Sequence, residues 1–427
     1  MKLRLLFLCS LVLFVLLSSS LTVLVNAQVS WVVWSQTYGG TDAYSVVETS
    51  DGGYALGGST SVFDPNGDFL LIKTDGYGNV EWNQTYRGTD YDFCYSMIAT
   101  SDGGYALAGP TRSYGNGNRD FWLVKTDNYG NVEWNQTYGT ADVEVAECLV
   151  QTSDGGYALA GYRQYINVDG VAVFWFVKTD SSGNMEWNKV FSGGGIDHAS
   201  SVIETSDGGY AILGNKYTLG ANYGYAWLIK TDELGNIEWD QSYEGTFRDI
   251  ANTLIETSDG EIAFACPTYL FGEGSADFWL IKMDLSGNIE LNQTYGGAKN
   301  DIPYSLVETS DGGFALAGST ESFGYENTDF WLVKTDDSGE MEWNRFYGSP
   351  EHEIAHSLVE NSDGGYTLAG DQGNWVQREQ KILVVRTNTQ GVPEFPSWTP
   401  ILVMIVAVVA VAVLYRHNLN KQIRGRF

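Results

Sequence analysis

One tetrapeptide recurs seven times at almost constant spacing, and this repeat limits the fold more than any other feature of the chain. Ser-Asp-Gly-Gly, or a close variant, places its Asp at positions 51, 102, 154, 207, 259, 311 and 363. A period of about 52 residues is typical of stacked or circular architectures in which each copy is one supersecondary unit. We therefore interpret most of the 427 residues as seven copies of one unit.

Each complete copy contains four short segments rich in β-branched and aromatic residues. Examples are residues 45–49, 54–58, 120–125 and 133–138. The Asp-Gly pair between the first two segments predicts a tight hairpin, because Gly supplies the positive φ that such turns require. Turn residues 127–131 predict a second hairpin between the third and fourth segments. Each copy is thus expected to be a four-stranded antiparallel meander.

Several of these segments are apolar on both faces, as residues 121–124 show. A sheet that faces water on one side alternates apolar and polar residues, so these strands must be covered on both sides. Seven four-stranded sheets, each packed between two neighbours, predict an all-β, seven-bladed β-propeller over residues 28–390. The last copy lacks a fourth segment, and the orphan segment 33–38 precedes the first copy. We expect this N-terminal strand to complete the last blade and close the ring.

The repeats read Trp-x-x-Thr-Tyr-Gly-Gly, Ser-Asp-Gly-Gly-Tyr and Asp-x-Trp-Leu-x-Lys-Thr-Asp in turn. This pattern resembles the propeller-repeat surface proteins of archaea and bacteria over residues 31–388. The resemblance implies a propeller fold and no particular activity. Residues 49–53 also resemble the Asp-box hairpin of sialidase-like propellers, although Leu56 stands where an aromatic residue is usual.

Both ends of the chain have the composition of targeting segments. Residues 1–27 carry a basic start, an apolar run and a Val-Asn-Ala site, which predicts a cleaved signal peptide, with an uncleaved anchor as the alternative. A Pro-rich spacer at 391–400 precedes the uncharged segment 401–415, which predicts a single transmembrane helix. The basic tail 416–427 is then cytoplasmic and the propeller extracellular. The Pro-Glu-Phe-Pro stretch at 393–396 also resembles the C-terminal sorting signals of archaeal surface proteins, which imply removal of the tail.

Net charge excludes one class of partner. The chain has 53 acidic and 24 basic side chains, a net charge of −29, so it repels nucleic-acid phosphates. Four Cys in the whole sequence exclude a disulfide scaffold. Cys94 and Cys148 leave one bridge between adjacent blades open, and small buried thiols are the alternative.

The loops that join the second strand to the third vary between copies and are rich in aromatic residues. Variable loops on a fixed scaffold are where recognition usually lies. Exposed rings stack on sugars or anchor proteins, whereas rings that fold back would only cover the sheets. The candidate ligand-binding residues are Tyr114, Tyr162, Tyr165, Tyr217, Tyr223, Tyr269, Phe271, Phe323, Tyr325 and Trp375.

An acidic residue precedes the first strand of every copy. We expect these side chains at the mouth of the channel, either as a calcium-binding ring or as caps of their own loops. The set comprises Asp42, which is shifted by one position, and Asp92, Glu144, Asp197, Asp249, Asp301 and Glu353. Calcium is the one cofactor that the sequence suggests.

Other motifs carry less weight. His352–His356 matches His-Glu-x-x-His, but zinc-protease chemistry needs that motif on a helix, and the repeat places it on a strand. Asn83, Asn135 and Asn292 begin glycosylation sequons on the expected outermost strands, unless they only repeat a strand sequence. No catalytic signature is recognisable. The sequence therefore favours a monomeric, membrane-anchored propeller that binds a glycan or a cell-surface protein, with a glycosidase-like enzyme or a passive envelope component as alternatives.

Overall fold

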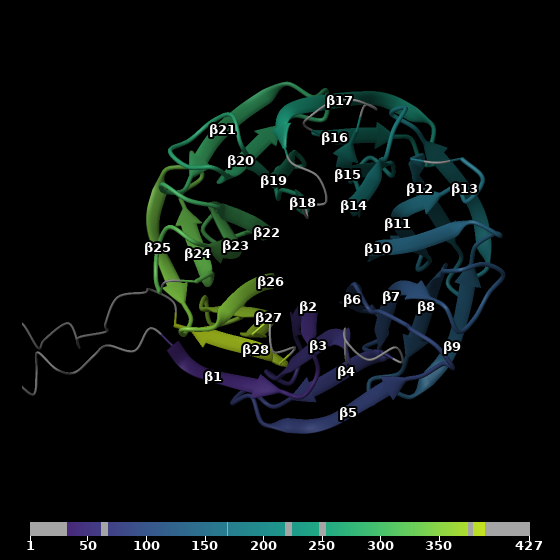
Figure 1. The fold of residues 1–427 in the computed structure, drawn as a ribbon, viewed down its shortest axis with the longest axis horizontal. Helices are drawn as coiled ribbons and strands as arrows, with labels where there is room; N and C mark the ends of the chain where they lie inside the picture. The colour runs from purple at the N-terminus through teal and green to yellow at the C-terminus, as the bar shows by residue number, and fades with distance from the viewer. Residues whose placement is uncertain are drawn as a thin grey trace, which may run out of the picture. The chain divides into compact units, whose positions relative to one another are not determined.

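Twenty-eight β-strands account for most of the residues described by the computed structural model, which are 32–60, 67–168, 170–217, 224–246, 253–325, 327–374 and 379–388. The predicted signal peptide, spacer, transmembrane segment and tail lie outside these ranges. No helix of the described part is long and apolar enough to cross a membrane. The strands form seven four-stranded antiparallel sheets in one ring, which confirms the predicted seven-bladed propeller (Figure 1).

The blades follow one another along the chain. Blade one contains β2 (Asp42–Glu48), β3 (Tyr54–Ser59), β4 (Phe69–Thr74) and β5 (Val80–Tyr86). Blade two contains β6 (Ser96–Ala99), β7 (Tyr105–Thr111), β8 (Asp120–Thr126) and β9 (Val132–Tyr138). Blade three contains β10 (Val143–Gln151), β11 (Tyr157–Gln164), β12 (Ala172–Thr179) and β13 (Met185–Phe191). Blade four contains β14 (His198–Glu204), β15 (Tyr210–Lys216), β16 (Gly224–Thr231) and β17 (Ile237–Thr246).

The remaining three blades complete the circle. Blade five contains β18 (Thr253–Glu256), β19 (Ile262–Thr268), β20 (Asp277–Met283) and β21 (Ile289–Tyr295). Blade six contains β22 (Asp301–Glu308), β23 (Phe314–Thr320), β24 (Asp329–Thr335) and β25 (Met341–Tyr347). Blade seven contains β26 (His352–Glu360), β27 (Tyr366–Asn374), β28 (Glu379–Thr387) and, as its outermost strand, β1 (Val32–Tyr38).

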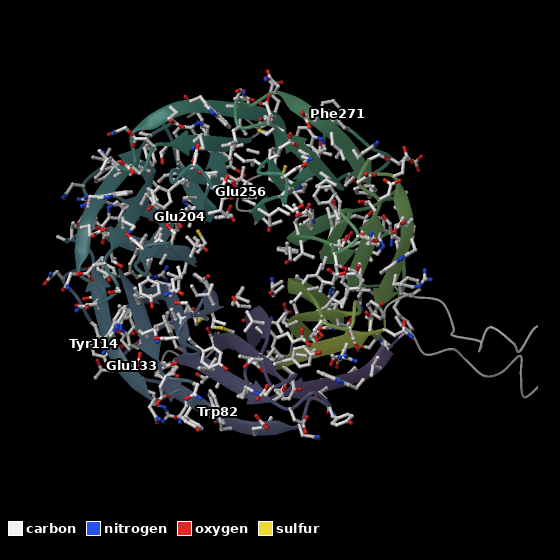
Figure 2. The ribbon with its side chains drawn as sticks, turned by 180° about the vertical axis from the view of Figure 1, so that it is seen from behind. Trp82, Tyr114, Glu133, Glu204, Glu256 and Phe271 are labelled. Atoms are coloured by element: carbon white, nitrogen blue, oxygen red, sulfur yellow. The ribbon has the colours of Figure 1, made fainter. Side chains whose placement is uncertain are left out.

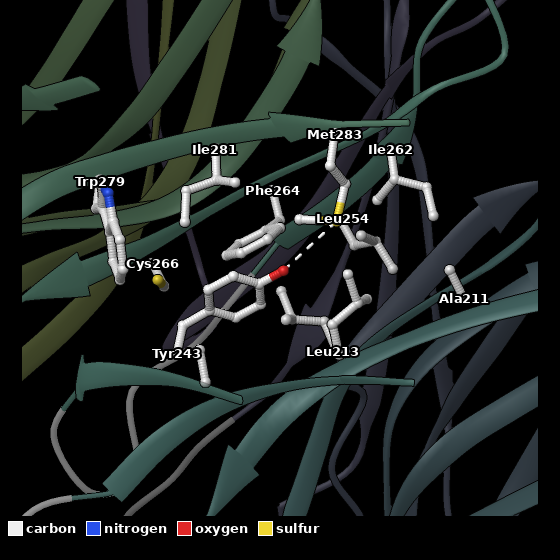
Figure 3. Packing of buried hydrophobic residues seen from close by; sticks show 12 residues of the cluster. Ala211, Leu213, Tyr243, Leu254, Ile262, Phe264, Cys266, Trp279, Ile281 and Met283 are labelled. Atoms are coloured by element: carbon white, nitrogen blue, oxygen red, sulfur yellow. Dashed lines mark hydrogen bonds between the residues drawn. The ribbon is translucent and has the colours of Figure 1, made fainter. Parts of the chain in front are cut away.

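Hydrophobic clusters fill the spaces between adjacent blades. Between blades four and five, Leu213 and Tyr243 of one sheet meet Phe264, Trp279 and Met283 of the next (Figure 3). All five side chains are buried, and the Tyr243 hydroxyl lies 3.5 Å from the Met283 sulfur. Both faces of the inner strands are therefore covered, which explains why they lack the alternation of a one-sided sheet.

The first strand closes the ring as predicted. In β1, Tyr38 pairs with Ile382 of β28, and its hydroxyl donates a hydrogen bond of 2.8 Å to the Gly78 carbonyl of blade one. Tyr138 of β9 makes the same bond to the Gly183 carbonyl of the following blade, at 2.7 Å. The N-terminal strand thus makes the contacts of a fourth strand at the junction of blades seven and one.

Hairpins between the first and second strands join neighbouring blades at six of the seven junctions. The amide and hydroxyl of Ser153 donate to the carboxylate of Glu204 at 2.6 and 3.0 Å. Ser362 of blade seven donates to Glu48 of blade one at 2.7 and 3.0 Å. Figure 2 shows Glu204 beside the central opening, on the inner side of the ring. The closing junction therefore reproduces the contacts of the other junctions.

A buried or partly buried basic side chain supports each of these hairpins. Lys230, 1% exposed in its side chain, contacts Asp207 at 2.8 Å and Glu238 at 3.1 Å. In blade one the equivalent Lys73 contacts Asp51, and hydrogen bonds from Thr49 and Lys73 lower the pKa of Asp51 to about 2. The same position is filled by Lys125, Lys178, Lys282 and Lys334, and by Arg386 in blade seven. This end of the propeller, which we call the hairpin face, is thus a repeated structural element.

Candidate binding site in the central channel

In five blades, a bulge in the innermost strand aims one side chain at the central channel. The pairing register of the first and second strands shifts between Ala43 and Ser45 in blade one, and between Pro303 and Ser305 in blade six. Blades three, four and seven contain the same shift. A bulge inserts an unpaired residue that turns away from the sheet ladder. The fold therefore provides one projecting position in each of these five blades.

The residue at this position changes from blade to blade while its neighbours repeat. We call the described members of the set the channel ring: Tyr44, Tyr95, Glu147, Ser200, Tyr304 and His356. All six are half-buried and line one cavity of about 490 Å³. The Ser that follows the bulge has a structural role instead, since Ser45 Oγ accepts a hydrogen bond from Met97 N of blade two at 2.9 Å.

One side of the cavity is a continuous aromatic wall. The Tyr44 ring contacts Tyr95 edge-on at 5.2 Å and lies 4.8 Å from the His356 ring, centroid to centroid. His356 in turn lies 5.3 Å from Tyr304. Burial raises the pKa of Tyr44 well above its usual value and that of Tyr304 to about 12. These phenols stay neutral at physiological pH and can both donate and accept hydrogen bonds.

The opposite side of the cavity is polar. Glu147, Ser200 and Asn215 line it, together with His198. The His198 ring stacks on Tyr162, with centroids 4.0 Å apart and planes inclined by 11°. Tyr162, one of the predicted loop aromatics, thus supports the rim of the cavity. The channel ring was missed by sequence reasoning, although variation at one position of an otherwise constant strand is visible in the repeat alignment.

Three predicted loop aromatics lie on the tops of the sheets. Tyr114, Phe271 and Phe323 occupy equivalent positions in blades two, five and six. Each packs on the tryptophan of the third strand, with centroids 5.2, 5.5 and 5.2 Å apart. Figure 2 shows Tyr114 and Phe271 near the outer rim, away from the central opening. These contacts favour the covering interpretation over a ligand role.

The remaining loop aromatics are dispersed. The Tyr165 ring lies under the Arg163 guanidinium at 5.1 Å, and burial raises the pKa of Tyr269. Tyr217 packs against Gly224, whereas Tyr325 is 54% exposed. Tyr223 and Trp375 lie outside the described residues. The described members of the predicted set therefore do not form one surface.

The described acidic residues at the strand entrances are buried and accept hydrogen bonds from the entering loop or from the end of the second strand of the same blade. Asp92 accepts from Thr111 Oγ1, Glu144 from Thr140 Oγ1, Asp197 from Tyr217 N, Asp301 from Gly297 N and Glu353 from Gln372 Nε2, at 2.5 to 3.1 Å. These are the contacts of loop caps. Asp249 lies outside the described residues, and calcium binding by this set stays a prediction.

Asp42 differs from the other entrance acids by the one-residue offset that the sequence shows. Asp42 pairs with Ser59, as Ile302 pairs with Ser319 in blade six, so it occupies the position after the entrance acid. Because successive strand residues point to opposite faces, the one-residue shift turns Asp42 toward a different neighbour. Its pKa is raised to about 6 by burial and by the charge of Asp371, against the opposing effect of His356.

A second set of buried acids begins the third strands and was not anticipated. Asp120, Asp277 and Asp329 are at most 1% exposed, and one oxygen of each has no hydrogen-bond partner among the described residues. Burial raises the pKa of Asp329 to about 6, and the charge of Glu353 adds to the shift. The two side chains approach one glycine, since a Cβ on Gly348 would lie 2.0 Å from Asp329 Oδ1 and 2.8 Å from Glu353 Oε2.

The other sequence motifs take structural positions. His352–His356 lies on strand β26, so the pattern is not on the helix that zinc-protease chemistry needs. Cys94, Cys148 and Cys266 are free thiols, so there is no bridge between Cys94 and Cys148. The three sequon asparagines are exposed on the outermost strands β5, β9 and β21. Asn135 and Asn292 also accept hydrogen bonds from Trp122 and Trp279, and glycosylation stays a prediction.

Comparisons with known proteins add no functional assignment. No protein-family model and no curated protein sequence match the chain. An α-L-arabinanase from Penicillium chrysogenum, in a structure with arabinobiose, is 13% identical, with 70% of this chain and 94% of that chain covered and a TM-score of 0.48. Sqt1 from Chaetomium thermophilum is 13% identical, with 84% and 85% covered and a TM-score of 0.48. The β-propeller domain of the Trilobed protease from Pyrococcus furiosus is 9% identical, with 86% and 99% covered and a TM-score of 0.44.

Proposed function

We propose that this propeller is a non-catalytic binding protein that takes a glycan in its central channel. The observation that carries the proposal is the channel ring, in which bulges aim side chains of different chemistry into one cavity of about 490 Å³. A binding site needs variation on a rigid frame, and the innermost strands provide both. The proposal moves the site inward from the loop aromatics that the sequence favours.

The two walls of the cavity suit a carbohydrate. Sugar rings present apolar faces that stack on aromatic side chains and hydroxyl groups that need hydrogen-bonding partners. Tyr44, Tyr95 and Tyr304 offer rings and neutral phenols on one wall. Glu147 and Asn215 offer acceptors and a donor on the other. A protein segment with an exposed polar side chain is the alternative occupant.

The lining favours retention over hydrolysis. A glycosidase of the common mechanism uses two carboxylic side chains on either side of the scissile bond. Among the described residues that line the cavity, Glu147 is the one carboxylate. We therefore propose binding without cleavage and keep a glycosidase-like activity as the alternative.

We further propose that the protein acts as a monomer at the cell surface. The support for the location is the sequence of its ends, with a predicted signal peptide at 1–27 and a predicted membrane segment at 401–415. A passive envelope component would share this location, so ligand binding is the property that separates the two functions.

The test uses the full-length protein on an array of polysaccharides, with retention and released reducing ends measured together. Retention without release is expected. Tyr44→Ala and Tyr304→Ala should each weaken binding about fivefold, since one ring contact contributes about 1 kcal/mol. Phe271→Ala, on the outer rim, is the matched control and should bind normally. Binding that is lost in Phe271→Ala but kept in the channel variants would refute the channel site, and released reducing ends would refute the non-catalytic function.

A further inference from the structure

Asp42, His356 and Asp371 form a cluster with the geometry of a metal site. One ligand atom from each residue lies within 4.8 Å of the other two. Asp42 stands on β2 of blade one, whereas His356 and Asp371 stand on β26 and β27 of blade seven. The cluster thus spans the junction at which the ring closes. It is the one group of three such side chains found among the described residues.

The cluster contains a buried oxygen that lacks a partner. Asp371 is 0% exposed, and its Oδ1 lies 2.7 Å from His356 Nε2. Its second oxygen, Oδ2, is buried and has no hydrogen-bond partner among the described residues. Asp42 is 3% exposed and adds a second carboxylate. Two buried carboxylates side by side are costly unless a cation neutralises them, and one protonated imidazole would balance only one of the two.

The three residues stand at three separate positions that the repeat does not fix. Where Asp42 stands, other described blades have Phe93, Val145, His198, Ile302 and Ile354. Where Asp371 stands, they have Ser59, Pro110, Tyr162, Asn215, Pro267 and Ser319. Where His356 stands, they have Tyr44, Tyr95, Glu147, Ser200 and Tyr304. The blade fold therefore requires none of the three, and their convergence on one point needs another explanation.

We propose that Asp42, His356 and Asp371 bind one divalent transition-metal ion that joins blade one to blade seven. One imidazole and two carboxylates match the preferences of zinc, whereas calcium prefers oxygen ligands alone. Metal bonds of about 2.1 Å place tetrahedral ligand atoms about 3.4 Å apart, so the contact between His356 and Asp371 opens slightly on binding.

The location gives this ion a defined role. An ion that binds the folded ring and not the unfolded chain stabilises the ring by an amount that grows with the logarithm of the ion concentration above Kd. His356 also lines the channel cavity, so a fourth coordination position is available from that side. The proposal does not depend on the glycan function, because the cluster would secure the closing junction whatever the channel binds.

The experiment measures metal content and thermal stability of the untagged full-length protein. After treatment with EDTA, the protein is titrated with Zn²⁺, and separately with Ca²⁺, by calorimetry and thermal denaturation. Co²⁺ serves as a spectroscopic probe, because its visible absorption reports the ligand set. We expect one equivalent of Zn²⁺, a melting temperature that rises with Zn²⁺ concentration, and no comparable response to Ca²⁺.

The variants use residues that other blades already tolerate at these positions. His356→Tyr and Asp371→Ser should fold, bind Zn²⁺ at least about tenfold more weakly and lose the cobalt spectrum. Asp301→Asn, a buried acid of blade six away from the closing junction, is the matched control and should bind one equivalent as the wild type does. Zinc uptake that persists unchanged in both cluster variants, or no uptake by the wild type, would overturn the proposal.

Discussion

Replacing Tyr38 should weaken the propeller as much as replacing Tyr138, because the two side chains occupy equivalent places at different blade junctions. Their hydroxyls donate to the carbonyls of Gly78 and Gly183 at 2.8 and 2.7 Å. The side chains are 9% and 5% exposed. A Phe variant removes the hydroxyl and leaves a buried carbonyl unpaired, which costs about 1–2 kcal/mol. An Ala variant also removes the ring, and the total loss becomes about 3–5 kcal/mol.

The assay is denaturant unfolding of the full-length protein, followed by tryptophan fluorescence. Tyr38→Phe and Tyr138→Phe should lower the midpoint by similar amounts, and the two Ala variants should lower it further. Tyr77→Phe is the control, since Tyr77 is 78% exposed and should unfold at the wild-type midpoint. If the Tyr38 variants unfold as the wild type does while the Tyr138 variants are destabilised, β1 does not hold the ring closed and the reasoning fails.

Two further predictions concern buried charges. Lys230→Met should lower the free energy of unfolding by about 1–3 kcal/mol. The loss is smaller than for a fully buried ion pair, because the side chains of Asp207 and Glu238 are 41% and 48% exposed. Lys189→Met, at the surface, is the control and should change the denaturant midpoint little. The pKa of Asp329 is raised to about 6, so the folded state binds the extra proton and this group's contribution to stability falls as pH rises from about 4 to about 6. Asp329→Asn should therefore raise the midpoint at pH 7.5 and leave it nearly unchanged at pH 4, and an equal shift at both values would contradict the assigned cause.

The fold could be predicted because the same strand and turn signals recur in seven copies. Each hairpin carries Asp-Gly at its turn, and the Gly52 φ of 80° is the positive value that the pair predicts. The closure was predictable by counting, since the last copy lacks a fourth segment and segment 33–38 has no copy of its own. The hairpins are local and are recorded in every copy, whereas the pairing of β1 with β28 follows from the number of segments alone.

The candidate sites rest on features that the repeat pattern does not record. In a regular strand, Tyr44 and Ser45 would point to opposite faces of the sheet. The bulge between Ala43 and Ser45 instead turns the Tyr44 side chain away from both faces. The contact between Asp42 and Asp371 joins residues that are far apart in the sequence and become neighbours only when the ring closes. The loop aromatics were predicted to bind a ligand because they lie in loops that vary between copies. In the structure, however, Phe271 and Phe323 mainly cover Trp279 and Trp331.

In a repeat protein, the positions where one copy breaks the pattern are more informative than the pattern itself. Residues that recur at one position, such as the hairpin-face cation that is Lys in six blades and Arg in blade seven, must serve the blade, because every blade has one. A residue found in one copy only is not required by the blade fold, so it is present by chance or for a separate function. Residues placed by chance would be scattered independently over the blades. His356, Asp371 and Asp42 instead meet at one point, at the junction of blades seven and one where the ring closes. Their convergence is therefore the strongest argument in this structure for a function beyond folding.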